Sequence, residues 1–451
     1  MVKIGLEIHG YILTKEKLFC KCKLEHGLKY AKSNTNICPI CTGQPGAKPL
    51  LPNKEAINKA IKIALSLGCK INRESIWQRK HYDWPDLPKG YQNTLSGSYA
   101  TPIGEKGNFL GIKITEVHLE EDPAAWNPKT GEIDYNRSGS PLIEIVTEPD
   151  FKTSEQVIEW LKELISLLGY IKCIDKSSGL KADINVSVEK GKRIEIKNIN
   201  SLNNIKNAID YEIKEQQKNL PKVQETKRYD SAKRETIKMR LKEQAQDYRF
   251  ISDPDLPLIQ INEKRIKKIK DSLPESPKTK LEKLIKKYKI EGRYAKILIK
   301  KLEIVEFFEQ IIEKTNPKLA VHWVIGELLN ILNYHKKGLE EVDIKPQHFI
   351  ELLDLIEKKK ITELKAQEIL RKFIPKSFSP KAEAKEGKKI SEKDEIEKLA
   401  EQIIKENPKA VKDYKSGKEQ AIHFLVGQIM KKSNKRADSE TTKEILKKML
   451  K

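Results

Sequence analysis

Apolar and polar side chains alternate along several segments of the first 200 residues. In residues 4–11, Ile4, Leu6 and Ile8 alternate with a glutamate and a histidine. A period of two is typical of a β-strand whose side chains face two different environments. Similar reasoning predicts strands over residues 112–122, 140–149, 181–188 and 193–200, of which the last two, separated by EKGK, form a predicted hairpin.

Other segments repeat their apolar residues with the period of a helix. They predict helices over residues 53–69, 154–170 and 202–218. Asn53 and Ser154 are candidate N-caps, and Gly169 lies near the end of the second helix. Two segments dense in proline, aromatic and charged residues, 79–94 and 247–258, are predicted to be loops without regular structure.

The pattern changes from about Leu273 onward, where the chain becomes helical, rich in lysine and poor in glycine. Residues 377–394 have the composition of a linker, and residues 395–451 predict a small helical module. The predicted fold class is therefore α+β, with an antiparallel-sheet domain followed by all-α domains. The expected boundaries are 1–280 for the sheet domain, 281–376 for a helical domain and 390–451 for a tail domain.

Length and composition restrict the class of protein. The chain has 451 residues, of which 38% are hydrophobic and 34% charged, and this length predicts two or three domains. No apolar run approaches twenty residues, which predicts no membrane span. The first residues, MVKIGLEIHG, lack the long apolar core of a signal peptide, so the expected compartment is the cytoplasm.

The charge is large and unevenly spread. The net charge is +22, but residues 1–150 hold 20 Lys and Arg against 17 Asp and Glu, so most of the excess lies in the rest of the chain. A basic rear half favours a polyanionic partner, most simply nucleic acid. A surface rich in lysine and glutamate is also typical of heat-adapted proteins, and charge alone does not decide between these readings.

Four of the six cysteines lie in residues 18–46. In order they are Cys20, Cys22, Cys38 and Cys41. Disulfides are disfavoured in the cytoplasm, and the turn-rich sequence after the second pair does not predict the helix of a redox C-x-x-C site. Two close pairs fifteen residues apart favour a tetrahedral Zn²⁺ knuckle, whose full thiolate shell makes it structural. Cys69 and Cys173 stand alone and are predicted to be core residues.

The predicted strands also carry acidic side chains on their polar faces. The pairs are Glu7 with His9, Glu120 with Glu121, and Asp183 with Glu195. Carboxylates joined by one imidazole suit Mg²⁺ or Mn²⁺, and Mg²⁺ usually accompanies a phosphate substrate, which Lys197 would meet as a point charge. For any single pair a solvated polar face is the better reading, whereas all of them together favour a metal site.

Two common nucleotide motifs are missing from the sequence. It has no G-x-x-x-x-G-K-[ST], so an ATP site would not be a P-loop, and no G-x-G-x-x-G follows a strand. Ser177 and Ser178 precede a strand without the glycine-rich setting of a nucleophilic serine. They are predicted to form a turn.

A series of unusual segments runs through the chain. They are KIGLEIHG, NTNICPICTGQPG, HYDWPDLPKGYQ, VHLEED, GSPLIEIVTEPDF, KNINS, DYRFISDPDLP and FLVGQIMKKSNKRADSETTKEILKKML. In this order they resemble the B subunit of the tRNA-dependent amidotransferase, over essentially the whole chain. The length and the paired cysteines look more like archaeal members, and a related archaeal protein with an inserted domain would be longer.

The resemblance implies a reaction and its partners. It implies that a cradle domain uses ATP and Mg²⁺ to phosphorylate the side-chain carboxylate of Asp-tRNA(Asn) or Glu-tRNA(Gln). Ammonia, channelled from the amidase that forms the A subunit, then displaces the phosphate to give the amide. It further implies a heterotrimer completed by the small C subunit, and a tail domain that holds the outer corner of the misacylated tRNA.

Carried over residue by residue, the resemblance assigns roles to this sequence. It implies that Glu7, His9, Glu120, Glu121, Asp183 and Glu195 are magnesium ligands. It implies Tyr82 and Lys89 as candidates for the ammonia passage and its gate, a role that their spacing alone does not indicate. The lack of a candidate glutaminase nucleophile places glutamine hydrolysis on a partner.

A second reading belongs to a different class of protein. In it the chain is a non-catalytic, zinc-stapled basic protein that binds RNA as a scaffold. The acidic strands distinguish the two readings, because a scaffold has no reason to gather carboxylates near RNA phosphates. ATP consumption that requires misacylated tRNA would favour the enzyme.

Overall fold

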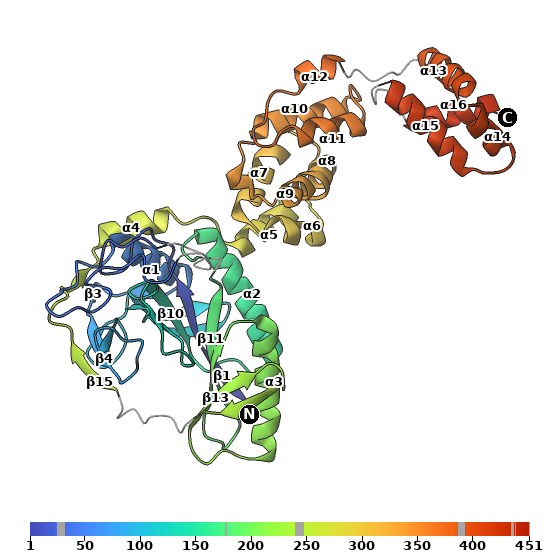
Figure 1. Cartoon of the computed structure of the whole chain (residues 1–451). Coiled ribbons are helices and arrows are strands. Elements are labelled where there is room, and N and C mark those ends of the chain that lie inside the picture. The colour runs from blue at the N-terminus through green and yellow to red at the C-terminus, as the bar shows by residue number, and fades with distance from the viewer. Residues whose placement is uncertain are drawn as a thin grey trace. The chain divides into compact units, whose positions relative to one another are not determined.

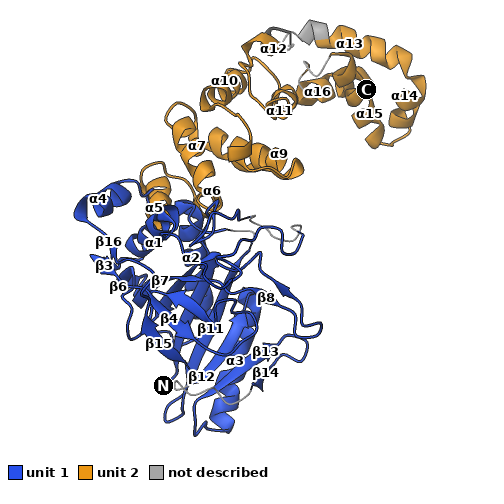
Figure 2. Cartoon of the chain, turned by 60° about the vertical axis from the view of Figure 1, so that its left-hand side comes forward, with its two compact units in different colours: residues 1–276 blue, residues 277–451 orange. Residues whose placement is uncertain are grey.

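The computed structural model describes residues 1–24, 32–175, 178–239, 248–386, 393–433, 437 and 439–450. The chain forms two compact units, residues 1–276 and 277–451, which Figure 2 colours separately. The first unit contains a large, mainly antiparallel sheet and the second is helical, so the predicted α+β class is confirmed. Residues 25–31 of the predicted knuckle and 387–392 of the predicted linker lie outside the described residues.

One sheet organises the first unit (Figure 1). The strands of this unit are β1 (Lys3–Tyr11), β2 (Lys70–Ile71), β3 (Glu74–Ser75), β4 (Gln78–His81), β5 (Tyr91–Thr94), β6 (Gly104–Phe109), β7 (Ile112–Glu121), β8 (Ala125–Trp126), β9 (Ile133–Asp134), β10 (Pro141–Thr147), β11 (Leu180–Ser187), β12 (Ile194–Ile199), β13 (Glu225–Asp230), β14 (Glu235–Lys238), β15 (Arg249–Ser252) and β16 (Ile259–Gln260). The main path runs β14-β13-β12-β11-β1-β10-β7-β5-β4-β15, with β6 and β2 added beside β7. Its neighbours are antiparallel except for β12 and β13.

Alternation gives the central strands one apolar face. Ile4, Leu6 and Ile8 of β1 are buried, and the antiparallel register places Leu6 opposite the equally buried Ile184 of β11. Helices α1 (Lys54–Ser66), α2 (Ser154–Ile171) and α3 (Leu202–Lys218) share one hydrophobic core with this face. Figure 1 shows α2 and α3 running along the sheet, and α4 (Glu263–Asp271) packs beside α1.

The helix ends agree with the sequence prediction at two positions and differ from it at one. Asn53 caps α1 as predicted, accepting two backbone N–H groups of the first turn. The N-cap of α2 is Thr153, and Ser154 is its first helical residue, so that prediction was wrong by one position. Gly169 lies near the end of this helix, as predicted, since the last helical residue is Ile171, and the C-cap Lys172 takes the left-handed conformation with φ 50°.

Two segments that were predicted to be loops contain strands. Residues 79–94 include most of β4 and all of β5, and residues 247–258 include β15, which pairs with β4. The reason is that β5 buries polar side chains, including Asn93 at 0% exposure, so it lacks the apolar alternation that reveals a strand. The loops in these two segments are residues 82–90, between β4 and β5, and residues 253–258, between β15 and β16.

Three smaller predictions concern isolated residues. Cys69 and Cys173 are buried in the core of the first unit, as predicted. Ser178 lies in a turn, also as predicted, and its hydroxyl donates to Asp175 at 2.6 Å. Ser177 lies outside the described residues.

All the regular elements in the described part of the second unit are helices. It contains α5 (Pro277–Lys286), α6 (Gly292–Leu298), α7 (Leu302–Ile312), α8 (Pro317–Val321), the π-helix η2 (His322–Leu328), α9 (Leu329–Tyr334), the 3-10 helix η3 (Leu339–Glu341), α10 (Pro346–Glu357), α11 (Glu363–Arg371) and α12 (Lys381–Glu386). It ends with α13 (Lys393–Glu406), α14 (Pro408–Lys415), α15 (Gln420–Lys432) and α16 (Ser439–Leu450), which share a core that includes Leu425 and Leu446. No helix among the described residues combines the length and apolarity needed to cross a bilayer. The three predicted domain boundaries stay a prediction.

Candidate active site and metal centres

The polar face of the sheet collects acidic and imidazole side chains from adjacent strands. Since successive side chains alternate, Glu7 and His9 lie on the face opposite Ile8. The register then places Glu7 opposite Asp183 on β11 and His9 opposite Glu144 on β10. Residues more than a hundred positions apart in the sequence therefore meet on one surface.

The first acidic group consists of His9, Glu120 and Glu144, whose ligand atoms lie within 4.8 Å of one another. His9 Nε2 lies 3.3 Å from Glu144 Oε2, and the buried His118 contacts the same oxygen at 3.1 Å. Burial lowers the pKa of His9, but its hydrogen bond to Glu144 and the charge of that residue outweigh burial and raise the pKa to about 9. Burial raises the pKa of Glu144, but the two histidines hold it well below its usual range. Carboxylates with an imidazole fit Mg²⁺ or Mn²⁺.

The second acidic group consists of Glu7, Asp183 and Glu195, again within 4.8 Å. Burial raises the pKa of Glu7, and the charge of Glu144 raises it further. Lys197 Nζ lies 2.8 Å from a carboxylate oxygen of Asp183 and 2.8 Å from one of Glu195. The ammonium thus neutralises part of this group, and a divalent cation here would share or displace it. Contact between Lys197 and a phosphate stays a prediction that requires this lysine to exchange partners.

A β-bulge explains how Lys197 reaches the acidic face. The β11–β12 register shifts beside Asp183, so that Lys197 and Asn198 together lie opposite this single residue. Asn198 takes the left-handed conformation with φ 58°, and its backbone N–H donates to Asp183 at 2.8 Å. A bulge redirects a side chain in this way and is common beside functional sites.

A polar cavity of about 170 Å³ borders both acidic groups. Its lining includes His9, Tyr11, Asp122, Lys181, Asp183 and Lys197. Lys181 lies opposite His9 in the β1–β11 register, and its ammonium forms no hydrogen bond or ion pair with any residue in the described part of the chain. A lysine without a bonded partner beside clustered acids fits an anionic ligand that arrives with a metal ion, such as phosphate.

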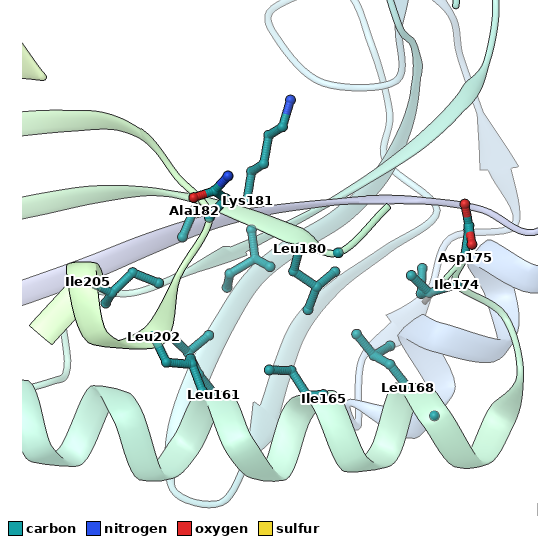
Figure 3. Close-up of a pocket in the computed structure, with 14 residues that line it drawn as sticks. Leu161, Ile165, Leu168, Ile174, Asp175, Leu180, Lys181, Ala182, Leu202 and Ile205 are labelled. Atoms are coloured by element: carbon teal, nitrogen blue, oxygen red, sulfur yellow. The ribbon is translucent and has the colours of Figure 1, made fainter. Parts of the chain in front are cut away.

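A larger cavity of about 360 Å³ lies on the opposite face of β11 (Figure 3). Leu161, Ile165 and Leu168 of α2 form one wall, and Leu180 contributes to the other. Figure 3 shows the side chain of Lys181 extending away from these apolar residues. The lining is nearly all apolar, so this cavity offers few groups for metal or phosphate chemistry.

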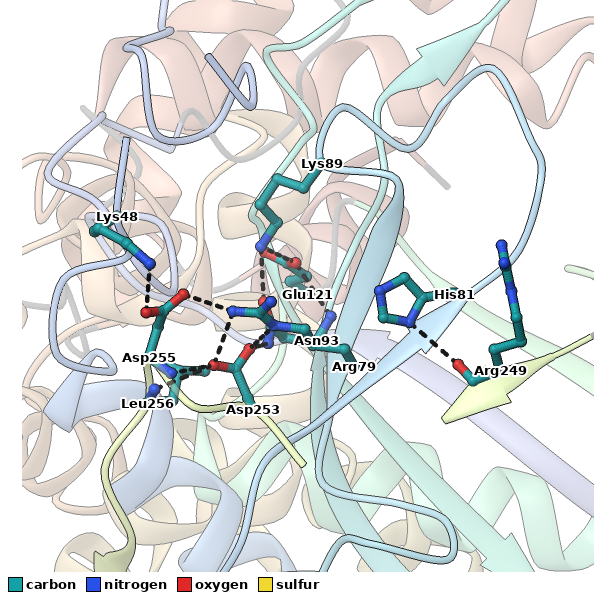
Figure 4. Close-up of polar contacts among 10 residues, drawn as sticks. All are labelled: Lys48, Arg79, His81, Lys89, Asn93, Glu121, Arg249, Asp253, Asp255 and Leu256. Atoms are coloured by element: carbon teal, nitrogen blue, oxygen red, sulfur yellow. Dashed lines mark hydrogen bonds and ion pairs between the residues drawn. The ribbon is translucent and has the colours of Figure 1, made fainter. Parts of the chain in front are cut away.

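Glu121 does not join either acidic group. Neighbouring residues of a strand face opposite sides, so Glu120 and Glu121 cannot both point to the metal face. Glu121 instead forms an ion pair with Lys89 and accepts the backbone N–H of Asn93 at 3.1 Å (Figure 4). Lys89 also donates to the side-chain oxygen of Asn93 at 2.7 Å. The structure therefore places Glu121 with Lys89 rather than among the predicted magnesium ligands.

A buried carboxylate supports this pair. The Asp253 side chain is 0% exposed and accepts hydrogen bonds from Arg79 Nε at 2.9 Å and Asn93 Nδ2 at 2.5 Å (Figure 4). Two backbone N–H groups of the following turn also donate to it. Arg79 and Lys48 further contact Asp255. This network fixes Asn93, which in turn contacts both Lys89 and Glu121.

Tyr82 begins the loop that ends near Lys89. Its ring contacts the Tyr248 ring edge-on, with centroids 5.6 Å apart. Burial raises the pKa of Tyr82, and the charges of Asp86 and Glu120 raise it further. Its role in ammonia passage, like that of Lys89, stays a prediction.

Glu144 is the candidate ligand that the sequence reasoning missed. It lies in PLIEIVT, where a single carboxylate interrupts an otherwise apolar strand. That isolated acid is a usable sign, because an unpaired charge on a buried strand requires a partner. The partners themselves, His9 and His118, come from other strands.

The four knuckle cysteines are free thiols whose sulfur atoms lie within 4.8 Å of one another. Tetrahedral zinc with bonds of about 2.3 Å needs sulfurs about 3.8 Å apart. Sγ of Cys38 and Sγ of Cys41 are 3.9 Å apart. A hydrogen bond from Cys20 and the buried ammonium of Lys17 lower the pKa of Cys41 to about 4, which favours the thiolate. The cluster fits a structural zinc site.

The knuckle packs closely against the loop that carries Lys89. Gly43, two residues after Cys41, has φ 66°, and a Cβ atom there would lie 2.2 Å from the carbonyl oxygen of Pro88. Only glycine tolerates both this conformation and this approach. The backbone before Lys89 is therefore in direct contact with the knuckle.

Comparison with known proteins assigns the class. Residues 2–267 match the family described as the GatB/GatE catalytic domain, and residues 306–450 match the GatB domain. The chain therefore belongs to this family and is one component of an amidotransferase, a ligase that forms carbon–nitrogen bonds. The non-catalytic scaffold is set aside.

Named relatives are similar over their whole length. The chain is 44% identical to the B subunit of the aspartyl/glutamyl-tRNA(Asn/Gln) amidotransferase of Methanocaldococcus jannaschii, covering 100% of this chain and 98% of the relative. It is 43% identical to the protein of the same name from Methanothermobacter thermautotrophicus, covering 99% of both. It is 42% identical to that of Methanopyrus kandleri, covering 100% and 98%. The resemblance seen in the sequence is confirmed.

Proposed function

We propose that this chain is the component that activates and amidates Asp-tRNA(Asn), Glu-tRNA(Gln) or both. The observation that carries the proposal is one polar cavity bordered by two acidic groups and by Lys181, which has no hydrogen bond or ion pair in the described structure. The named relatives support it, because their printed names specify these tRNA substrates. Misacylated tRNA, ATP and ammonia are then the three reactants that meet at this chain.

The first step makes a leaving group from a carboxylate. An oxygen of the aspartyl or glutamyl side chain attacks the γ-phosphorus of ATP, the bond to the β-phosphate oxygen breaks, and an acyl phosphate and ADP form. A magnesium ion held by His9, Glu120 and Glu144 would offset the phosphate charge. Lys181 would hold the transferred phosphoryl group, and Glu7, Asp183 and Glu195 would hold a second cation or Lys197.

The second step forms the amide. The nitrogen lone pair of ammonia attacks the acyl carbon, the carbon–oxygen bond to phosphate breaks, and inorganic phosphate leaves as the nitrogen loses a proton. Ammonia must arrive unprotonated, since ammonium has no lone pair. Lys89, Glu121 and Asn93 form a largely buried polar cluster suited to admit it, and Tyr82 lies where the same loop begins. The knuckle, loaded with Zn²⁺, would hold this loop in place.

The ammonia itself would come from a partner. Four of the six cysteines form the knuckle, and burial raises the pKa of Cys69 to about 12 and that of Cys173 to about 11, which suppresses both thiolates. We therefore assign glutamine hydrolysis to an amidase, the A subunit, with a small C subunit completing a cytoplasmic heterotrimer. The basic tail, residues 390–451, would add contacts to tRNA phosphates.

The test uses the full-length chain alone, with misacylated tRNA, ATP and ammonium chloride. We expect ADP, phosphate and the amidated aminoacyl-tRNA in equal amounts, with no product when the tRNA is uncharged. Glutamine in place of ammonium should give no amide and no glutamate. Glutamate release, or ATP hydrolysis that ignores the aminoacyl group, would overturn the assignment.

A further inference from the structure

Two tryptophans form an aromatic pair beyond the end of β7. Trp84 lies in the loop between β4 and β5, and Trp126 lies on β8. Their ring centroids are 5.6 Å apart at an interplanar angle of 86°. Trp84 is 50% exposed, whereas Trp77, Trp160 and Trp323 are buried. The indole ring of Trp84 is therefore accessible to solvent, and its contact with Trp126 fixes its orientation.

A second aromatic cluster is formed around Tyr248, which precedes β15, the strand that pairs with β4. Tyr248 contacts the rings of Tyr82 and Phe250, with centroids 5.6 and 6.1 Å away. Lys80 Nζ lies 4.8 Å from the centre of the Tyr248 ring. The positive charge of Lys80 also acts on Glu120, which belongs to the first acidic group. Tyr82, which starts the loop that carries Trp84, thus links this cluster in sequence to the tryptophan pair.

The chain path keeps the tryptophan pair close to the polar cavity. Trp126 follows Asp122 by four residues, so their Cα atoms are at most about 14 Å apart. Asp122 lines the cavity, and the backbone N–H of Ala124 donates to the carbonyl of Asp86 in the Trp84 loop at 2.9 Å. Both tryptophans are therefore tethered to the strand end that carries the acids.

We propose that Trp84 and Trp126 stack the unpaired bases at the 3′ end of the substrate tRNA. This inference rests on the proposed function. In an aminoacyl-tRNA only the terminal ribose and the amino acid separate the last base from the carboxylate that reacts, so that base must lie beside the metal site. Exposed aromatic rings are the usual platforms for unpaired bases, with flanking cations near the phosphates, as Lys80 and Arg249 are here.

The first measurement is the affinity of the full-length chain for a tRNA(Gln) or tRNA(Asn) transcript with and without its 3′-terminal CCA. Stacking of one base is worth about 1–3 kcal/mol, so the intact tRNA should bind about tenfold tighter or more. Trp84→Ala should bind intact tRNA as weakly as the unaltered chain binds the truncated one. Tyr99→Ala, which removes another aromatic ring that is 55% exposed, should retain the full difference.

The second measurement is spectroscopic. Since the other three tryptophans are buried, quenching of intrinsic fluorescence by a CCA oligonucleotide should come from Trp84 and Trp126 and be lost in Trp84→Phe with Trp126→Phe. Thermal melting checks that each variant folds.

The outcomes separate this inference from the proposed function. If the unaltered chain binds neither tRNA, both fail. If it binds intact and truncated tRNA equally, only the stacking proposal fails. It also fails if Trp84→Ala weakens association with the amidase while the tRNA difference persists, or if ATP alone causes the quenching.

Discussion

The ammonium of Lys197 lies 2.8 Å from Asp183, because β12 bulges opposite that single residue. It contacts Glu195 at the same distance. Three clustered carboxylates would repel one another, and this lysine supplies a compensating charge within the protein. The second acidic group is therefore stable before any metal binds.

Lys197→Met should expose that repulsion. Loss of one partner from a largely buried ion pair is strongly destabilising, and partial exposure of the lysine reduces the effect to about 2 kcal/mol of unfolding free energy. Mn²⁺ should restore much of the loss by taking the vacated position. Denaturant unfolding with and without Mn²⁺ measures both effects. Lys181→Met is the matched control and should leave stability unchanged, since Lys181 has no ion pair in the described structure; equal destabilisation of both variants would contradict this account.

His9→Ala and Glu144→Gln should each abolish ATP-dependent activation while leaving tRNA affinity nearly unchanged. Each removes one ligand from the first acidic group without touching the basic tail. The measurement is ADP formation that depends on misacylated tRNA, together with Mn²⁺ binding followed by electron paramagnetic resonance. Glu163→Gln, on the exposed side of α2, is the control. Unaltered Mn²⁺ affinity in both variants would rule out this metal site.

Asp253→Asn should impair use of ammonia without impairing activation. The change weakens the hydrogen bonds that fix Asn93, which contacts both Lys89 and Glu121. Misplacement of groups by about 1 Å can cost about a hundredfold in rate, so amide formation should fall well below ADP formation. The ratio of amide to ADP is the readout. A ratio that stays at one in Asp253→Asn and in Lys89→Ala would show that this network has no part in amidation.

The purified chain should contain one zinc ion, measured by elemental analysis without chelator. Cys41→Ser should lose it and melt at a lower temperature, because binding of the metal and folding of the knuckle are coupled. Cys173→Ala removes a buried thiol outside the cluster and should keep the metal. Protein without zinc that melts like the loaded form would leave the cluster as free thiols.

Removal of residues from Lys393 onward should weaken tRNA binding. Basic contacts to phosphate release counterions, so the truncated chain should also show a shallower dependence of affinity on salt concentration. Ammonium-dependent chemistry should persist at saturating tRNA. Equal affinity at low and moderate salt would place the tRNA contacts elsewhere in the chain.

The sequence predicts the central sheet well, because β1 and β11 bury one face and show strict alternation. It fails at β5, where Gln92, Asn93 and Thr94 are buried polar residues whose partners come from other segments. Local periodicity reports burial of apolar side chains, and carries no information on a strand that is stabilised by a polar network.

The residues of the candidate site also divide into those that the local sequence pattern predicts and those that depend on contacts between strands. The acids of the first and last central strands are visible as alternating polar positions, so Glu7, Asp183 and Glu195 could be named. Glu144 was missed because its place in the first acidic group depends on the register between β10 and its neighbouring strands. Glu121 was predicted to act together with Glu120, although the two side chains lie on opposite faces of β7. The bulge that aims Lys197 is likewise a property of two paired strands.

The contact between Gly43 and Pro88 limits which substitutions this chain can accept during evolution. A side chain at position 43 would displace the backbone that precedes Lys89, and a reshaped loop would remove the surface on which the knuckle rests. The sequence of the knuckle at Gly43 and the sequence of the loop before Lys89 therefore cannot change independently of each other. Among descendants of this sequence, replacement of Gly43 should be found only together with compensating changes in residues 86–90, as a linked pair of mutations.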